Sequence, residues 1–510
     1  MRYGFVIDHT RCIGCHACTV ACKEENRVPL GVYRTWVKYV EKGIFPDARR
    51  YFSVLRCNHC DEPPCVTICP TSALFRRADG IVDFDGARCI GCKSCMQACP
   101  YDAVYIDPTT QTAAKCNYCA HRVEVGLEPA CVIVCPTQAI VTGDLDDPSG
   151  RIARLVATEH TQVRKPEQGT RPKLFYLGAE MASLTPQAAE RGDSYLFAET
   201  GMSSSAVPKP APPDLSTARD VQTMARNVYD VAHLDRPWGW MVSTYLWTKS
   251  VAAGALLLSA LGIAAGWAAA DPLAGIAAPG LALLFLALTT ALLVFDLKRP
   301  DRFHSILFKP NWRSWLVRGA WTLMAFGTVA AVWLIGGLMG STPLLRLLAW
   351  PAAVLAAAAA GYSAFLFGQA EGREFWQSPL LLWHLLVAAV LAGGASLILV
   401  ALVLGEESAV VNLVGKILAL ALLAEGLVLV AELFGSPRNQ GAAPAAHLLT
   451  HGELSGWFWG GVAAGGLLVP FLLLLVGGSA GAAVAALLAL AGVWLYEDLW
   501  VRAGQALPLS

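Results

Sequence analysis

The chain has no cysteine after position 135, since all sixteen of its cysteines lie between Cys12 and Cys135. Charge is also scarce, with 15% charged residues and a formal net charge of zero, so there is no electrostatic basis for binding nucleic acid. Hydrophobic residues make up 55% of the 510, which is too apolar for an ordinary soluble protein. The sequence therefore predicts two parts with different chemistry.

No secretory leader is visible in the opening residues "MRYGFVIDHT", because they lack a basic run followed by an apolar stretch. The arginine pairs Arg49-Arg50 and Arg76-Arg77 lie inside the cysteine region, where they cannot act as an N-terminal export signal. We therefore expect the cysteine-rich part to mature in the cytoplasm.

The cysteines form four groups, at residues 12–22, 57–69, 89–99 and 116–135, and three of the groups end in Cys-Pro. The C-x2-C-x2-C-x3-C-P spacing is the bacterial ferredoxin pattern, in which three thiolates hold one [4Fe-4S] cube and the fourth reaches a neighbouring cube. Four cubes would use every cysteine, although spacing alone does not say which groups pair. The predicted metal ligands are Cys12, Cys15, Cys18, Cys22, Cys57, Cys60, Cys65, Cys69, Cys89, Cys92, Cys95, Cys99, Cys116, Cys119, Cys131 and Cys135.

Two other uses of cysteine fit this pattern less well. A disulfide framework is typical of small secreted domains, and the repeated C-x2-C-x2-C spacing does not suit it. Structural zinc often includes histidine among its four ligands and does not usually show the terminal Cys-Pro. Between the cysteine groups, residues 80–84 and 103–107 look like strands, and residues 17–26 and 94–101 look like short helices. We therefore expect a small α+β fold around the clusters.

Three stretches carry a family resemblance: "CNHCDEPPCVTICPTSAL", "CIGCKSCMQACPYDAV" and "CNYCAHRVEVGLEPACVIVCPTQAI". They resemble the four-cluster iron-sulfur subunits of the dimethyl sulfoxide reductase and polysulfide reductase family, over residues 3–180. The resemblance implies a double ferredoxin-like domain in which the first and fourth groups share two cubes, and the second and third groups share the other two. The implied ligand sets are Cys12, Cys15, Cys18 and Cys135; Cys116, Cys119, Cys131 and Cys22; Cys57, Cys60, Cys65 and Cys99; and Cys89, Cys92, Cys95 and Cys69.

The chain divides into an iron-sulfur domain at residues 1–180, a linker at 181–235 and a membrane domain at 236–510. The linker contains "GMSSSAVPKPAPPDLSTARD", whose Ser, Pro and Ala content predicts a tether that does not fold alone. The membrane domain has apolar stretches long enough to cross a bilayer as helices, with tryptophans at their ends. We expect an all-α bundle of eight spans, at 240–268, 273–296, 316–339, 346–369, 379–404, 410–434, 457–476 and 479–500.

Basic residues predict the orientation of this bundle. Lys298, Arg299, Arg302, Lys309 and Arg313 lie on the side of the iron-sulfur domain, whereas the opposite loops offer little beyond Arg346. Since positive residues stay in the cytoplasm, we expect an integral inner (cytoplasmic) membrane protein whose iron-sulfur domain faces the cytoplasm. The periplasm is the alternative, because several relatives work there.

The membrane half resembles the polysulfide reductase membrane subunit (NrfD-like) family in "WGWMVSTYLWTKSVAAG" at 238–254 and "DLKRPDRF" at 296–303. The two parts are usually separate chains, and here they are fused. His384 is the only histidine clearly within a predicted span, so paired haem ligands are missing and no haem is expected. A quinone, menaquinone or ubiquinone, is the electron carrier that a bilayer offers instead.

Ionisable residues inside the spans are the candidate quinone-binding residues, because such residues are expensive in hydrocarbon and usually functional. Lys249 and Glu425 lie at matching depth, so we expect them to approach each other, with Glu432 extending the polar path toward the surface. The other candidates are His233, Asp235, Tyr245, Asp296 and His384, and Tyr496 and Glu497 are expected in the same half of the bundle. Each has a structural alternative, such as helix packing for His384 and solvation for His233 and Asp235.

We expect an electron-transfer and membrane-anchor subunit of a multi-subunit respiratory oxidoreductase, which passes electrons between a catalytic subunit and the quinone pool. No catalytic residue for a hydrophilic substrate is predicted in this chain. The main substrate site would therefore lie on a partner, which the resemblance implies to be of the molybdopterin type. The alternatives are a proton-translocating energy-coupling module and a ferredoxin-linked quinone reductase without a molybdenum partner.

Overall fold

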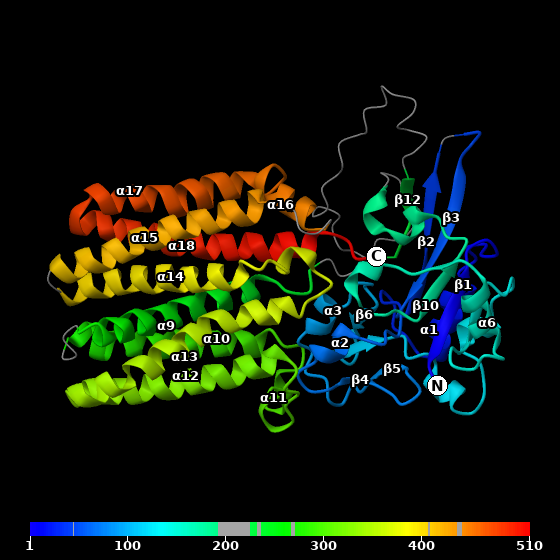
Figure 1. The fold of residues 1–510 in the computed structure, drawn as a ribbon, viewed down its shortest axis with the longest axis horizontal. Helices are drawn as coiled ribbons and strands as arrows, with labels where there is room; N and C mark the ends of the chain where they lie inside the picture. Colours follow the sequence, from blue (N-terminus) through cyan, green and yellow to red (C-terminus); the bar gives the residue numbers. More distant parts are fainter. Residues whose placement is uncertain (44, 192–224, 232–235, 267–270, 406–407, 436–440) are drawn as a thin grey trace. The chain divides into compact units, whose positions relative to one another are not determined.

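The computed structural model describes residues 1–43, 45–191, 225–231, 236–266, 271–405, 408–435 and 441–510, and every statement below refers to these ranges. The chain forms two compact units (Figure 1). The cluster unit comprises residues 1–237 together with 508–510, and the membrane unit comprises residues 238–507.

The cluster unit contains a four-stranded sheet in the order β8-β1-β10-β9. Its strands are β1 (Tyr3–Asp8), β8 (Ile140–Asp144), β9 (Thr161–Gln162) and β10 (Leu174–Leu177). The first strand pairs in parallel with β10 and antiparallel with β8, so the two ends of the cysteine region meet in one sheet. Helix α6 (Arg151–Thr158) packs against β8 and β1, and the segment after it contains the 3-10 turn η1 (Pro166–Gln168).

A second sheet includes strands from both described ends of the predicted linker. Its order is β11-β12-β2-β3, with β2 (Thr35–Lys42), β3 (Arg49–Arg56), β11 (Ala189–Arg191) and β12 (Ala225–Tyr229). Both described ends of the segment 181–235 thus belong to the cluster unit, and its start also forms α7 (Met181–Leu184) and η2 (Pro186–Ala188). Strand β12 alternates buried Ala225 and Asn227 with exposed Arg226, and it takes its hydrogen bonds from the edge of β2.

Short elements surround the cysteine groups. The hairpins are β4 (Leu74–Arg76) with β5 (Val82–Phe84), and β6 (Val104–Ile106) with β7 (Ala113–Lys115). The helices are α1 (Ala17–Glu25), α2 (Pro64–Thr67), α3 (Ser94–Ala98), α4 (Ala120–Val123) and α5 (Ala130–Ile133). The strands expected at 80–84 and 103–107 and the helices expected at 17–26 and 94–101 are therefore confirmed, with slightly different ends. The mixed α/β architecture of the cysteine region is confirmed with them.

The membrane unit contains, within the described residues, eight helical spans that are long and apolar enough to cross a bilayer. They are Trp240–Ala264, Leu273–Phe295, Trp315–Leu338, Thr342–Gly368, Leu381–Leu404, Val410–Phe434, Trp457–Val476 and Gly478–Ala506. In the same order, these spans are α9, η3 with α10, α12, α13, α14, α15 (Ser408–Phe434), η6 with α17, and α18. The segments η3 (Leu273–Ala277) and η6 (Trp457–Leu468) are π-helical. The eight predicted spans are confirmed.

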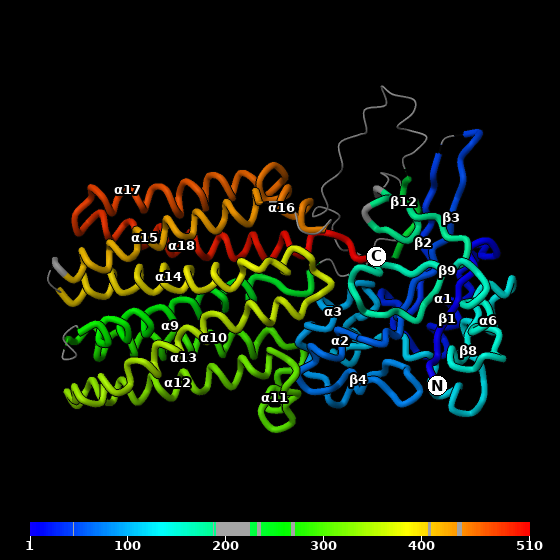
Figure 2. Tube along the Cα trace, viewed as in Figure 1, coloured from blue at the N-terminus to red at the C-terminus, as the bar shows by residue number. Residues whose placement is uncertain are grey.

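Figure 2 shows the chain of the membrane unit passing back and forth along one common direction. Short helices lie in its connections, namely η4 (Pro300–Arg302), α11 (Ser305–Phe308), η5 (Glu374–Trp376) and α16 (Ala442–Thr450). An even number of spans brings Trp238 and Leu507, where the unit begins and ends, to the same end of the bundle. We call this end the entry end.

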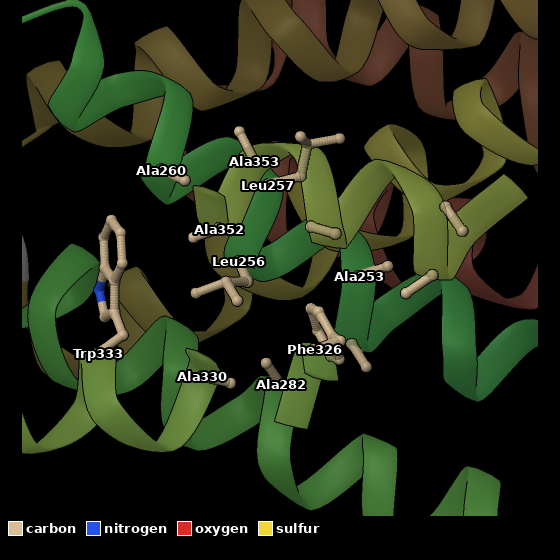
Figure 3. Packing of buried hydrophobic residues seen from close by; sticks show 14 of the residues in the cluster. Ala253, Leu256, Leu257, Ala260, Ala282, Phe326, Ala330, Trp333, Ala352 and Ala353 are labelled. Atoms are coloured by element: carbon tan, nitrogen blue, oxygen red, sulfur yellow. The ribbon is translucent and has the colours of Figure 1, made fainter. Parts of the chain in front are cut away.

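Helix α9 is the central helix of the bundle, because it packs against α10, α13, α14 and α18. Its Leu256 and Leu257 meet alanines of neighbouring helices and the ring of Phe326 in a dense apolar cluster (Figure 3). Small residues let helices approach closely in a bilayer, where packing replaces the hydrophobic effect as the driving force. At the α9–α14 crossing, Gly254 and Gly393 bring the two backbones together.

This crossing gives a stability prediction. A Cβ added at Gly254 would lie 1.8 Å from the carbonyl oxygen of Ala389, so Gly254→Ala must push α9 and α14 apart. Overpacking of this kind costs about 1–3 kcal/mol, and we expect a lower midpoint of thermal unfolding in detergent. The matched control is Gly426→Ala on α15, where a Cβ meets nothing within 4 Å. Equal midpoints for the two variants would contradict this packing.

Candidate metal centres and a buried polar network

Three cavities in the cluster unit are each lined by four cysteines. The three sets are Cys12, Cys15, Cys18 and Cys135; Cys57, Cys60, Cys65 and Cys99; and Cys69, Cys89, Cys92 and Cys95. In every set, three cysteines come from one sequence group and the fourth comes from another. The structure therefore brings these cysteines together in the sets that the family resemblance implies.

The remaining four cysteines form the fourth set. Cys22 lies within electrostatic range of Cys116, Cys119 and Cys131. The side-chain amide of Asn26 donates to the sulfurs of both Cys22 and Cys119, at 3.8 and 3.6 Å. Helix α1 carries Cys22 and packs against α5, which carries Cys131, so the packing of two short helices assembles this set.

The cysteine sets fit a polynuclear cluster better than a single metal ion. Tetrahedral zinc, with Zn–S bonds of about 2.3 Å, requires sulfurs that nearly touch one another. Among the described residues, no group of three or more Cys, His, Asp or Glu side chains is placed to hold one ion. Sulfurs arranged around a cavity suit a [4Fe-4S] cube, which carries its iron atoms at separate corners.

Turns around the cysteines aim backbone amides at the sulfurs. The amides of His59 and Tyr118, both at positive φ, lie 3.4 Å from the sulfurs of Cys57 and Cys116, and the Ala139 amide lies 3.3 Å from Cys135. Such N–H···S contacts stabilise the negative charge of a bound thiolate and tune a cluster's reduction potential.

Burial raises the pKa of Cys18 and Cys99 to about 11 each, because the apolar surroundings disfavour the thiolate. Iron-sulfur clusters are bound by thiolates, not by thiols. The positive iron atoms would therefore supply the charge that keeps these sulfurs deprotonated, and cluster binding is coupled to folding of the cluster unit.

A second concentration of polar side chains lies inside the membrane unit. Lys249 on α9 donates to the Ser363 hydroxyl at 2.7 Å and to the Ala360 carbonyl at 2.8 Å, both on α13. Tyr245, one turn earlier on α9, also interacts with Ser363 and with the charges of Asp296 and Glu497. Glu497 on α18 interacts electrostatically with Lys249 as well.

His384 links this group to two more carboxylates. Its Nδ1 lies 2.7 Å from Oε1 of Glu425, and its Nε2 lies 3.8 Å from Oε1 of Glu497. The imidazole ring packs edge-on against Tyr496, with ring centroids 5.0 Å apart, and the Tyr496 hydroxyl donates to Glu432 at 3.4 Å. Six of the eight predicted site residues, Tyr245, Lys249, Asp296, His384, Glu425 and Glu432, therefore lie in one polar network.

The network lies toward the entry end of the bundle. Lys249, Glu425 and Glu497 are each about 14 Å from the ends of α9, α15 and α18 at that side, at 1.5 Å per residue. The matching depth of Lys249 and Glu425 is thus confirmed. His233 and Asp235, also predicted for the site, lie outside the described residues.

Lys249 and Glu425, which were predicted to approach each other, lie in the same network but bond to different partners. Lys249 reaches Ser363 because α9 packs against α13, whereas Glu425 reaches His384 because α15 packs against α14. Counting residues along the sequence gives the depth of a side chain in the bilayer, but it does not show which helix packs beside it. Ser363 was missed entirely, since one serine in the apolar run of α13 gives no signal of its own.

Comparison with known proteins agrees with both halves of this description. A family model described as polysulphide reductase, NrfD matches residues 229–508, more than half of the chain, so the chain belongs to this family. A 4Fe-4S dicluster domain matches residues 48–145, and a 4Fe-4S binding domain matches residues 9–28. The chain is therefore a fusion of an iron-sulfur domain with an NrfD membrane domain.

Curated relatives match about a third of this chain. A tetrathionate reductase subunit of Salmonella typhimurium is 48% identical over 189 residues, which cover 36% of this chain and 76% of the relative. A polysulfide reductase chain of Wolinella succinogenes is 45% identical over 179 residues, covering 34% and 93%. The arsenate respiratory reductase iron-sulfur subunit of a Shewanella species is 34% identical over 225 residues, covering 35% and 96%. The relatives are subunits of multi-subunit reductases, so the iron-sulfur part has the ancestry of an electron-transfer subunit.

The cysteine sets predict how single substitutions group together. Cys135→Ala should perturb the same electron paramagnetic resonance signal as Cys15→Ala, because both sulfurs line one cavity. Cys131→Ala should instead perturb the signal that Cys119→Ala perturbs, although Cys131 and Cys135 are four residues apart.

Thr137→Ala is the control for this comparison, because its hydroxyl lies 3.8 Å from the Cys135 sulfur without serving as a ligand. It should leave all signals in place. If Cys135→Ala and Cys131→Ala perturbed the same signal, the assignment of ligands would be wrong.

Proposed function

We propose that this protein is the electron-transfer and membrane-anchor subunit of a respiratory oxidoreductase, and that it passes electrons between a catalytic subunit and the quinone pool. The observation that carries the proposal is the buried polar network at the entry end of the membrane unit. Three further observations support the proposal: the four cysteine sets, the polar atoms of the network that lack hydrogen-bond partners, and the exposure of one cysteine at the surface.

Four [4Fe-4S] clusters follow from sixteen cysteines arranged in four sets of four. When bound, such clusters transfer single electrons. The first and fourth cysteine groups share two sets through α1 and α5, and the second and third groups share the other two through α2 and α3. Adjacent sets therefore have ligands that lie four residues apart, within one short helix or just beyond its end, which favours electron transfer between neighbouring clusters.

A quinone site in the membrane unit is supported by polar atoms that lack hydrogen-bond partners. Buried groups of this kind are rare in folded proteins and usually indicate a ligand, an ion or water. In the described part of the membrane unit these atoms include Oε2 of Glu425, Oε1 of Glu432, Oε2 of Glu497 and Nε1 of Trp500. All but the last belong to the network.

The network suits the chemistry of a quinone, whose reduction to quinol takes two electrons and two protons. Its carbonyl oxygens need donors, which Lys249, His384 and the tyrosine hydroxyls supply. The carboxyl groups of Glu425 and Glu497 flank His384 and can deliver or receive the protons through the imidazole. Menaquinone and ubiquinone both satisfy these requirements.

The exposure of one cysteine set supports a docking surface for the catalytic partner. Cys15 is the only exposed cysteine of the sixteen, so its cluster lies nearest to solvent. Ile13 in the Cys15 loop is 57% exposed, and Val20 and Ile133, on the mutually packed helices α1 and α5, are 65% and 58% exposed. Isolated exposed apolar residues are ordinary, but apolar residues exposed on the elements that carry the ligands Cys15, Cys18 and Cys131 favour contact with the catalytic subunit.

We also propose the type of catalytic partner and the orientation of the protein in the membrane. The family resemblance supports a molybdopterin-type catalytic partner, with the main substrate site on that partner. Basic residues in the loop between α10 and α12, including Lys298, Lys309 and Arg313, support an entry end on the cytoplasmic side. The iron-sulfur domain would then face the cytoplasm, with the periplasm as the alternative.

The quinone site predicts a loss of reactivity when the network is altered. Glu497→Gln and His384→Gln should slow reoxidation of the reduced clusters by menaquinone or ubiquinone analogues by roughly 10²-fold, because proton transfer is removed. Lys416→Gln is the matched control, since Lys416 is an exposed ionisable residue on α15 beyond Glu425 from the entry end. Native rates in both network variants would contradict the proposed site.

The same purified protein in proteoliposomes separates the quinone function from proton translocation. The network is confined to the entry half of the described bundle, so we expect proton uptake to equal that consumed by quinone chemistry. Uptake beyond this amount would support the energy-coupling alternative instead.

The docking surface predicts a weakened complex in Val20→Asp. A buried valine contributes about 1.5–3 kcal/mol, so its loss should reduce recovery of the catalytic subunit in co-purification by tenfold or more. Phe45→Asp is the control, because Phe45 is 92% exposed near the tip of the β2–β3 hairpin, away from Cys15. If the native chain were isolated with a ferredoxin and no metal-pterin subunit, the ferredoxin-linked alternative would replace this partner.

A further inference from the structure

Arg56 is a buried cation between two of the cysteine sets. It ends strand β3, its side chain is 1% exposed, and its guanidinium lies 4.7 Å above the ring of Phe5. Its Nη1 donates to the sulfur of Cys131 at 3.0 Å. The strand continues directly into Cys57, so the backbone holds this side chain at a fixed place beside the clusters.

No carboxylate neutralises Arg56 among the described residues. Burial lowers the pKa of the guanidinium, but the neighbouring cysteines Cys131, Cys18 and Cys116 outweigh this effect and hold that pKa above its usual range. Its Nε and Nη2 have no hydrogen-bond partner in the described structure. An unpaired charge is strongly destabilising in a protein interior, so negative charge at this place is needed to compensate it.

The thiolates of a bound cluster would supply this negative charge, because burial raises the pKa of Cys18 and Cys116 and so keeps them protonated when no cluster is bound. Cys18 belongs to the set of Cys12, Cys15 and Cys135, whereas Cys131 and Cys116 belong to the set of Cys22 and Cys119. Arg56 therefore lies close to sulfurs of both sets and would be near both cubes when they are bound. The buried cation Lys115 differs from Arg56, because it donates to the carbonyl oxygens of Val82 and Cys116.

We propose that Arg56 raises the reduction potentials of these two cubes and so sets the level at which they accept electrons. Each cube gains one negative charge when it takes up one electron, with no bond made or broken and no proton required. A fixed positive charge in a medium of low dielectric constant stabilises this reduced form more than the oxidised form. The inference rests on the proposed function for the presence of the cubes, and it assigns Arg56 a positioning role, not a catalytic one.

Redox titration of the full-length protein, followed by electron paramagnetic resonance, tests this role. In Arg56→Gln and Arg56→Met the equilibrium constant for reduction of these two cubes should fall about tenfold, or ~59 mV for a one-electron couple. The cubes of the second and third cysteine groups should keep their midpoints. Arg56→Lys, which retains the charge, should restore most of the shift.

Arg50→Gln is the matched control, because Arg50 lies on the same strand, is half-exposed and pairs with Glu41 instead of a cysteine. It should leave all midpoints unchanged. Unchanged midpoints in the neutral Arg56 variants would overturn the inference, as would an equal shift in Arg56→Lys. Both neutral variants could instead lose these two cubes. If Arg56→Lys then kept them at native potential, the result would support the inference that a positive charge at position 56 stabilises the two cubes. Absence of four cubes from the unaltered protein would instead overturn the proposed function.

Discussion

The cluster unit depends on one constraint, which is that each cysteine set takes its fourth sulfur from a different sequence group. Cys135 must reach the loop that holds Cys12, and Cys22 must reach Cys116 and Cys119. This requirement brings the beginning and the end of the cysteine region together. The sheet does the same, because β1, which precedes the first cysteine group, pairs with β8 and β10, which follow the last. Cysteines are part of the buried core itself, since eight of them lie in one apolar cluster with Ile68, Leu74 and Val82 and two more lie in a second cluster with Phe5 and Tyr176.

The membrane unit is built differently, since its apolar clusters are rich in alanine and leucine and few ionisable side chains are buried within its described spans. Against this background the network of Lys249, His384, Glu425 and Glu497 is conspicuous. It lies in helices whose ends meet at the entry end, and among the described residues of this unit it holds most of the buried polar side-chain atoms without hydrogen-bond partners. A bilayer protein keeps such groups where they serve a ligand or a proton.

The sequence was sufficient for features that depend on local spacing. The cysteine sets follow from motif spacing and family resemblance, and the eight spans follow from the length of apolar runs. Features that depend on contacts between distant segments were not accessible. Strand β12 is short and lies in a segment rich in Ser and Pro, so nothing local indicated that it pairs with β2. The partner of Lys249 depends on which helices surround α9, and the role of Arg56 depends on a sulfur 75 residues away.

The central claim is that thiolate-bound cubes in the cluster unit form the electron path of this protein. Chemical analysis of iron and acid-labile sulfide in the anaerobically purified chain tests it most directly. Sixteen cysteines in four sets predict about sixteen iron and sixteen sulfide per chain. Eight or fewer irons, or zinc in their place, would contradict the account.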